Sequence, residues 1–320
     1  MMRREGATSV FFPTMGVLMR LVTRSDFDGL VCGVLLRAEG LVDKYAFVHP
    51  KDLQDGLVPV TKNDILANVA YAPGCGMWFD HHSSELERVG QVDVEGLAKV
   101  APSCARVVWE YFGGNAKFPA HLDGLLDAVD KVDSGQLSAD EVNNPHGWIL
   151  LGFLMDPRTG MQNQSGFSVN AHDLMVKLMD VCAAMPPEEV LALPDVKERI
   201  DCYIAQEMQF RGMLEKCSRQ TNNVLITDLR NQDETYTGNR FTVYALYPEC
   251  NVSIHVMWGY KRERVILAVG HSILNRTCKA DIGKLMLQYG GGGHARVGTC
   301  QVPVANAENV IAEIVAVLQE

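Results

Sequence analysis

Apolar residues are distributed differently in the first half of the chain and in its last third. In the first half, short apolar runs end at polar or acidic turns, which is typical of the buried strands of a parallel sheet. These runs cover residues 18–23, 45–49, 64–71 and 76–79. Longer runs with helical spacing lie between or after them, at residues 30–38, 104–112 and 122–131. Strands that alternate with helices predict an α/β fold with a largely parallel sheet.

The pattern changes twice towards the C-terminus. Residues 170–221 contain many helix formers and few strand signals. Beyond them, β-branched and aromatic runs predict strands over 224–227, 241–247, 252–258 and 265–269, and helices follow over 281–289 and 307–318. We therefore expect a tail over residues 1–18, with Met19 as the plausible true start, a first domain over 19–185, a helical linker over 186–222, and a smaller α/β domain over 223–320.

Composition places the chain among ordinary globular proteins. Its 320 residues are 47% hydrophobic and 21% charged, which excludes wholesale disorder and is enough chain for two domains. The nine cysteines contain no C-x-x-C pair, so reduced cysteines in a cytoplasm are favoured over a zinc knuckle or a disulfide framework. No apolar run reaches the length of a membrane span, and we expect a cytoplasmic protein without a membrane segment.

Charge is spread unevenly. The formal net charge of -10 argues against broad binding of duplex nucleic acid, which needs a basic surface. Residues 255–300, however, carry seven basic and two acidic side chains. An acidic body suits metal ions and a basic C-terminal segment suits a small anion, although charges that only solvate a surface would give the same count.

Three acidic motifs fall where predicted elements end, which is where open α/β sheets bind their ligands. Asp26 and Asp28 follow the first strand, Asp80-His81-His82 follows the fourth, and Asp133-Ser134-Gly135 ends a helix that also carries Asp130. Carboxylates suit hard divalent cations, and an imidazole beside a carboxylate can ligate manganese, iron or cobalt. The plainer alternatives are ordinary turns, solvated histidines, and a helix end neutralised by Lys131.

A fourth motif lies inside the basic segment. Four glycines, residues 290–293, precede His294 and Arg296. Glycine amides without a Cβ let phosphate oxygens approach closely, and Arg can bind them through two donors. A flexible hinge is the alternative, but the junction to His and Arg favours an anion site.

In this order of motifs, the chain resembles the DHH phosphoesterase superfamily with its DHH-associated C-terminal domain, over roughly residues 19–320. RecJ exonucleases, nanoRNase/pAp phosphatases and exopolyphosphatase-like proteins are members. The resemblance implies a site in the cleft between the two domains, with two divalent metal ions, usually manganese, that activate water. The resemblance depends on two motifs that occur together, Asp-His-His and a distal Gly-Gly-Gly-Gly-His.

Carried over residue by residue, the resemblance implies three groups of site residues. The positions of the metal ligands are Asp26, Asp28, Asn68, His81 and Asp133. The catalytic group is His82, which faces the substrate, with Asp80 orienting the histidines and Arg24 beside the first motif. The substrate phosphate would be bound by Arg276, Gly291, Gly292, Gly293, His294 and Arg296.

Three positions depart from the family pattern. Val22 stands where the family often has a histidine, and RecJ-like members have an aspartate where Arg24 stands. Asn68 replaces the aspartate that bridges the two metals, and a neutral amide oxygen bridges two cations poorly. We therefore expect one tight metal near Asp28 and a second that is weak, brought by the substrate, or replaced by the Arg24 guanidinium.

The implied activity is hydrolysis of a phosphoester in a small nucleotide, such as a short oligoribonucleotide, pAp or a cyclic dinucleotide. A phosphoanhydride hydrolase acting on polyphosphate or pyrophosphate is the alternative. A non-catalytic nucleotide-binding regulator also stays open because of Val22 and Asn68. The expected partner is a nucleotide or a short single-stranded oligonucleotide, and whether the chain forms a homodimer stays open.

Overall fold

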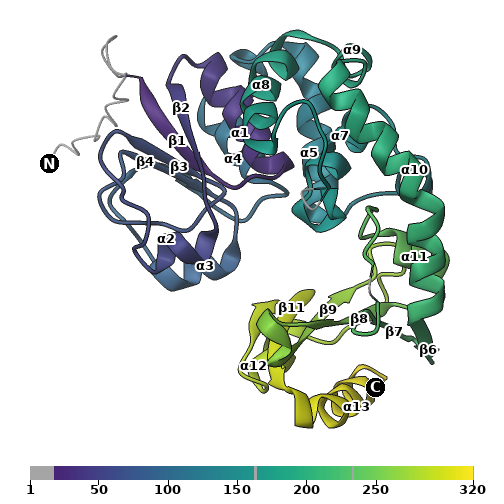
Figure 1. Cartoon of the computed structure of the whole chain (residues 1–320). Coiled ribbons are helices and arrows are strands. Elements are labelled where there is room, and N and C mark those ends of the chain that lie inside the picture. Colours follow the sequence, from purple (N-terminus) through teal and green to yellow (C-terminus); the bar gives the residue numbers. More distant parts are fainter. Residues whose placement is uncertain (1–17, 162–163, 233, 320) are drawn as a thin grey trace, which may run out of the picture.

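The computed structural model describes residues 18–161, 164–232 and 234–319. It contains two β-sheets, one in an N-terminal lobe and one in a C-terminal lobe (Figure 1). The N-terminal lobe holds the first sheet and the helices up to α9, and the C-terminal lobe holds the second sheet with α12 and α13. Of the expected tail over residues 1–18, residues 1–17 lie outside the described residues.

The first sheet has five parallel strands, as expected for this α/β fold. In sheet order they are β2 (Val42–Phe47), β1 (Met19–Thr23), β3 (Asp64–Ala67), β4 (Met77–Asp80) and β5 (Glu95–Ala98). The strand β5 has no strong apolar run and is not among the predicted strands.

Both faces of this sheet are covered, which is why its strands read as continuous apolar runs. Leu21, Ile65 and Phe79 point to one core cluster and their neighbours Val22, Leu66 and Trp78 to the other. The larger cluster is covered by α1 (Phe27–Ala38), α4 (Cys104–Tyr111), α5 (Asp123–Ser134), α7 (Gly147–Met155) and α8 (Ala171–Ala184). The short helices of the other side are α2 (Pro50–Gln54) and α3 (Ser83–Val89).

The turn from β1 into α1 is fixed by close backbone packing. Asp26 caps α1 by accepting the N–H of Gly29 at 2.9 Å. A Cβ on Gly29 would lie 2.2 Å from the backbone oxygen of Arg24 and 2.7 Å from Thr23 Oγ1. Only glycine therefore fits this turn, which places Asp26 and Asp28 at the carboxyl edge of the sheet.

The helices α6 (Ala139–Asn143) and α9 (Pro187–Leu191) complete the N-terminal lobe, and α10 (Pro194–Cys217) runs from it to the second sheet (Figure 1). The second sheet is mixed, because β7 pairs with β8 in parallel and its other pairs are antiparallel. In sheet order its strands are β10 (Gly292–His294), β11 (Val297–Pro303), β9 (Arg264–His271), β8 (Val252–Trp258), β7 (Val224–Asp228) and β6 (Ser218–Thr221). Its core is completed by α12 (Ile282–Leu287) and α13 (Ala307–Leu318).

One predicted strand is wrong. Residues 241–247 form no strand, because Thr242–Leu246 is the helix α11. Its apolar residues Phe241, Val243 and Tyr244 are buried in the core cluster of the N-terminal lobe instead of joining the second sheet. Packing against that core decides the conformation over the β propensity of the residues. The segment consequently ties the two lobes together.

Candidate functional site

Three side chains from distant parts of the chain meet at the carboxyl edge of the first sheet. Asp28 lies in the first turn of α1, His81 follows β4 directly, and Asp133 lies in the last turn of α5. One ligand atom of each lies within 4.8 Å of the others, and we call these three residues the metal cluster because they could hold an ion. His81 Nε2 is 3.6 Å from Asp28 Oδ2 and 3.3 Å from Asp133 Oδ2. Two carboxylates and an imidazole at this spacing suit a divalent metal ion.

The hydrogen bonding of His81 leaves one ring nitrogen free for such an ion. Its Nδ1–H donates to the backbone oxygen of Ala101 at 3.1 Å, so Nε2 carries the lone pair of the neutral ring. Nε2 is buried and has no hydrogen-bond partner among the residues that the structure describes. Metal-bound histidines commonly hold their other N–H on a carbonyl oxygen in this way, so the residues present fit a divalent cation.

Asp28 is held by the N-terminus of α4. Its Oδ2 accepts the N–H of Cys104 and its Oδ1 the N–H of Ala105, both at 2.8 Å. Burial, and after it the negative charge of Asp133, raises the pKa of Asp28 to about 7. Two carboxylates this close repel each other, and a cation between them would offset the repulsion.

Asp26 has different surroundings, although it lies only two residues away. Its Oδ1 accepts from the backbone of Gly29 at 2.9 Å and from Asn68 Nδ2 at 3.0 Å, and Arg24 Nε lies 3.0 Å from its Oδ2. Val22, at the position where the family often has a histidine, is fully buried in the core. The Oδ1 of Asn68 is buried without a partner in the described part of the chain. Both oxygens of Asp26 thus face donors, and one of these donors, Arg24, is a cation.

Asp80 orients the two histidines that follow it. Its Oδ1 accepts the backbone N–H of His81 and the Nδ1–H of His82, both at 2.8 Å. Burial opposes a charged imidazole, but the hydrogen bond and the charge of Asp80 raise the pKa of His82 above its usual value. His82 can therefore hold a proton beside the metal cluster.

Asp130 does not join this cluster. Ser103 Oγ donates to it at 2.6 Å, and Arg106 pairs with it at 2.6 Å. Lys131, the plainer alternative to a metal for neutralising this helix end, pairs with Glu141 instead. Arg106 takes that role from α4, which the spacing along the sequence could not indicate.

The glycine-rich segment brings His294 to the metal side of the C-terminal lobe. Gly292–His294 forms β10, and Gly293, with a φ of 155°, packs so closely on β11 that a Cβ would lie 2.2 Å from the backbone oxygen of Val297. His294 Nδ1 lies 3.3 Å from Ser83 Oγ, and its ring stacks on His82 with centroids 6.1 Å apart. Burial, and then the charges of His82 and His81, lower the pKa of His294.

Arg276 and Arg296 lie around a separate cavity of the same lobe. The cavity has a volume of about 270 Å³ and is also lined by Lys279 and Asp281. Arg276 reaches across to the N-terminal lobe, where its Nη2 donates to the backbone oxygen of Gly135 at 2.6 Å. Gly135 is two residues beyond Asp133, so Arg276 connects this cavity to the neighbourhood of the metal cluster.

Three charged residues near the metal cluster carry no motif and are absent from the sequence predictions. They are Asp156, Arg158 and Arg240. Arg158 Nε donates to Asp156 Oδ1 at 2.7 Å and Arg240 Nε donates to Asp156 Oδ2 at 2.9 Å. No spacing links Arg240 to the other two, and only the fold brings them together.

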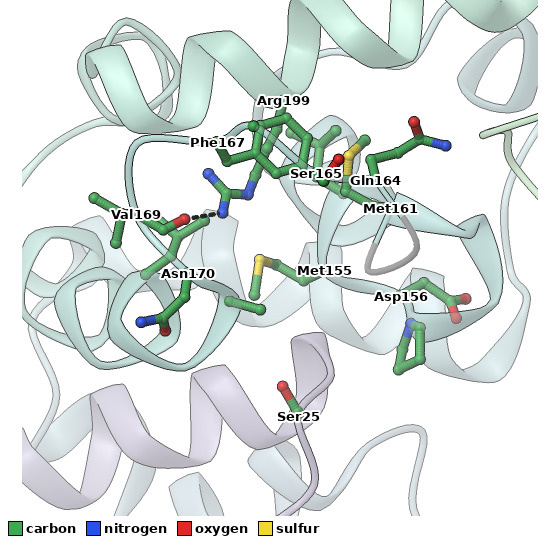
Figure 2. A pocket seen from close by; sticks show the side chains of 15 residues that line it. Ser25, Met155, Asp156, Met161, Gln164, Ser165, Phe167, Val169, Asn170 and Arg199 are labelled. Carbon is green, nitrogen blue, oxygen red and sulfur yellow. Dashed lines mark hydrogen bonds between the residues drawn. The ribbon is translucent and has the colours of Figure 1, made fainter.

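Asp156 also lines another cavity, larger than the one at Arg276 and shown in Figure 2. This cavity has a volume of about 340 Å³, within the range of small-molecule sites. Its lining is mostly apolar, with Met155, Met161 and Phe167, and Ser25 at its floor adjoins Asp26. The guanidinium of Arg199 lies 4.3 Å from the centre of the Phe167 ring. An apolar hollow beside an acidic cluster suits a ligand with a flat ring and a charged group.

The chain is similar to a solved structure of PggH, a pGpG-specific phosphodiesterase from Vibrio cholerae. The two are 45% identical with a TM-score of 0.79, over 94% of this chain and 99% of that protein. RecJ from Thermus thermophilus, solved in complex with Mn²⁺, shares the fold at 14% identity and a TM-score of 0.54, over 95% of this chain and 52% of RecJ. No protein-family model matches the chain, and no curated protein does. Among the described residues, no helix is long and apolar enough to cross a membrane.

Proposed function

The chain belongs to the DHH phosphoesterase superfamily, and from this premise we propose that it cleaves the phosphodiester bond of a 5′-phosphorylated dinucleotide such as pGpG. Membership makes it a hydrolase of phosphoester bonds. The dinucleotide is the substrate named for the Vibrio cholerae relative, and 45% identity over nearly the whole of both chains supports the same substrate class here.

The observation that carries the proposal is the convergence of Asp28, His81 and Asp133 within 4.8 Å. These three residues would hold one divalent ion, for which we propose Mn²⁺. When bound, such an ion lowers the pKa of water and draws charge from the phosphate oxygens. The free Nε2 of His81 and the mutual repulsion of the two carboxylates support this assignment.

We assign a single tight ion to the site. Around Asp26, the Arg24 guanidinium lies 3.0 Å from one carboxylate oxygen, and Asn68 and the Gly29 amide donate to the other. The Arg24 guanidinium supplies the positive charge that a second ion would bring, and its unused N–H groups can bind a phosphate oxygen. A second ion would bind weakly or arrive with the substrate.

His82 is the proposed proton donor. Because Asp80 accepts from its Nδ1, the opposite nitrogen, Nε2, is directed away from Asp80 and can donate to the leaving oxygen. The raised pKa of His82 favours the form of the ring in which Nε2 carries this proton. Asp80 is a positioning residue, since it fixes the orientation of both histidines.

The C-terminal lobe would contact the internal phosphodiester of the substrate. His294 lies beside His82 and Ser83, and the glycines Gly291, Gly292 and Gly293 precede it in the chain. Arg276 and Arg296 line a neighbouring basic cavity that would attract the anionic substrate towards the site. The hydrogen bond from Arg276 to Gly135 would couple substrate binding in the C-terminal lobe to the position of the α5 end in the N-terminal lobe.

The apolar cavity beside Ser25 supports a nucleotide over polyphosphate. Met155, Met161 and Phe167 offer a flat base dispersion and stacking contacts, whereas a phosphate chain gains nothing from them. The basic cavity at Arg276 is the one feature that favours the phosphoanhydride alternative.

The test is a Mn²⁺-supplemented assay of pGpG, pAp, a cyclic dinucleotide and polyphosphate. Water enters at the internal phosphate and the 3′-oxygen leaves, so pGpG should yield two GMP. Asp133→Asn should abolish this reaction, and Asp130→Asn, on the same helix, is the matched control. Binding of pGpG without turnover would favour a regulator, and preferential release of phosphate from polyphosphate would favour the anhydride hydrolase.

A further inference from the structure

Arg158 and Arg240 form a pair of guanidinium groups on one carboxylate. Asp156 is only 6% exposed, and it accepts Arg158 Nε on one oxygen and Arg240 Nε on the other. No hydrogen bond from an Nη atom of either guanidinium is present in the described part of the chain. The cluster has a net charge of +1, and its terminal N–H groups remain available to an anion.

The backbone holds the pair in place from both sides. Arg158 lies in the short 3₁₀ helix Pro157–Thr159, where Thr159 Oγ1 donates to the backbone oxygen of Asp156 at 2.8 Å. The N–H of Gly238, two residues before Arg240, donates to the backbone oxygen of Thr159 at 3.0 Å. The Arg240 guanidinium also stacks on the Phe241 ring at 3.9 Å. The site is therefore built from rigid parts of both the α7 end and the segment that joins the lobes.

The charges of the three side chains act on one another. Burial alone would raise the pKa of Asp156, but Arg158 and Arg240 lower it to about 2. Burial and the charge of Arg158 lower the pKa of Arg240 to about 10. The two cations therefore repel each other, and a bound anion would relieve this repulsion. Asp156, which holds the pair, lines the same cavity as Ser25, the residue before Asp26, so the pair lies on the side of that cavity that adjoins the first acidic motif.

We propose that Arg158 and Arg240 bind the terminal 5′-phosphate of the dinucleotide, while its internal phosphodiester lies at Asp28, His81 and Asp133. This inference rests on the proposed function and adds how the enzyme would measure substrate length. A dinucleotide with a 5′-phosphate carries two phosphates one nucleotide apart, and the terminal one has a charge of about -1.5 to -2 near neutral pH. Two guanidinium forks suit such a dianion better than a single lysine would.

The test compares pGpG with GpG, the same dinucleotide without its 5′-phosphate. The wild type should prefer pGpG by about 10- to 100-fold in kcat/KM, the range expected when charge-assisted hydrogen bonds are lost. In Arg158→Gln and in Arg240→Gln this ratio should fall to within about threefold, mainly through a higher KM for pGpG. Arg211→Gln, which removes an arginine of the α10 surface paired with Glu207, is the matched control and should keep the wild-type ratio.

The outcomes separate this inference from the proposed function. Hydrolysis of pGpG and GpG at equal rates by the wild type would overturn the inference and leave the phosphodiesterase in place. Failure to cleave either dinucleotide, or bis(4-nitrophenyl) phosphate, with Mn²⁺ would overturn both. A merely structural pair would lower the melting temperature and reduce both rates together, with the ratio unchanged. If Arg240→Gln fails to fold, the ratio measured in Arg158→Gln decides, because the Arg158 side chain is 54% exposed and its replacement should leave the fold intact.

Discussion

Asp28 and Asp26 lie in the same turn, and their different surroundings are the reason why we propose Asp28, and not Asp26, as a ligand of the tight ion. Asp28 faces a second carboxylate and the lone pair of a neutral imidazole, so its surroundings are short of positive charge. Asp26 faces a guanidinium, an amide donor and a backbone N–H, so a cation already lies beside it, although burial still raises its pKa. A motif of two aspartates can therefore place two carboxylates at one edge while the neighbouring side chains decide which of them attracts a cation.

The largest effect should come from His81→Ala, which removes the ligand with the free Nε2. We expect Mn²⁺-dependent hydrolysis to fall by about 1,000-fold or more, because a bound metal contributes several kcal/mol to the transition state. Tight Mn²⁺ binding should disappear with it. Activity assays and calorimetry on the same preparation check both, and retention of wild-type Mn²⁺ affinity would remove His81 from the site.

A smaller effect should follow Asp80→Asn, which keeps the shape but removes the charge that orients His82. Partners of this kind contribute about 10- to 100-fold to activity. Because Asp80 raises the pKa of His82, the wild-type histidine stays protonated to higher pH than an ordinary one. If His82 is the proton donor, the alkaline limb of the pH–rate profile should move to lower pH in the variant. An unmoved limb would exclude that role.

Asn68→Asp tests the Asp26 side of the comparison directly. The new carboxylate would face Asp26 at the position of the present 3.0 Å hydrogen bond and recreate an acidic pair. Asn68 has a φ of 59°, a conformation that Asp tolerates nearly as well as Asn. We expect a second Mn²⁺ ion to bind at least about tenfold more tightly than in the wild type, since an anionic oxygen replaces a neutral one. Calorimetry that still shows a single ion would mean that Arg24, and not Asn68, blocks the second site.

The smallest effect is expected for Asp130→Asn, one turn before Asp133 on the same helix. Asp130 is paired with Arg106 and Ser103, so its loss should cost about 1 kcal/mol of stability and change activity less than about threefold. Thermal unfolding and the pGpG assay measure the two effects. A large loss of activity would show that the acidic helix end works as a unit.

The sequence predicted most of the elements that carry the metal cluster. Asp28, His81 and Asp133 each follow or end a segment whose apolar pattern is strong, and the edge of a parallel sheet brings such ends together. The strand predicted over residues 241–247 failed because its apolar residues pack on the core of the other lobe, which no local pattern encodes.

The arginine pair could not be predicted for a related reason. Arg158 and Arg240 are 82 positions apart, with no motif between them, and they meet only because Asp156 and the backbone contact of Gly238 hold them together. The partner of Asp130 was missed in the same way, since Arg106 approaches from another helix. Charges paired across elements are set by the packing of the helices, and sequence spacing reports only pairs within one element.

The most direct test of the account is the number of Mn²⁺ ions that metal-free protein binds, measured by isothermal titration calorimetry. The account predicts one tightly bound ion per chain, which is lost in His81→Ala and kept in Asp130→Asn. Two ions of equal affinity per chain, or a tight ion that survives His81→Ala, would contradict it.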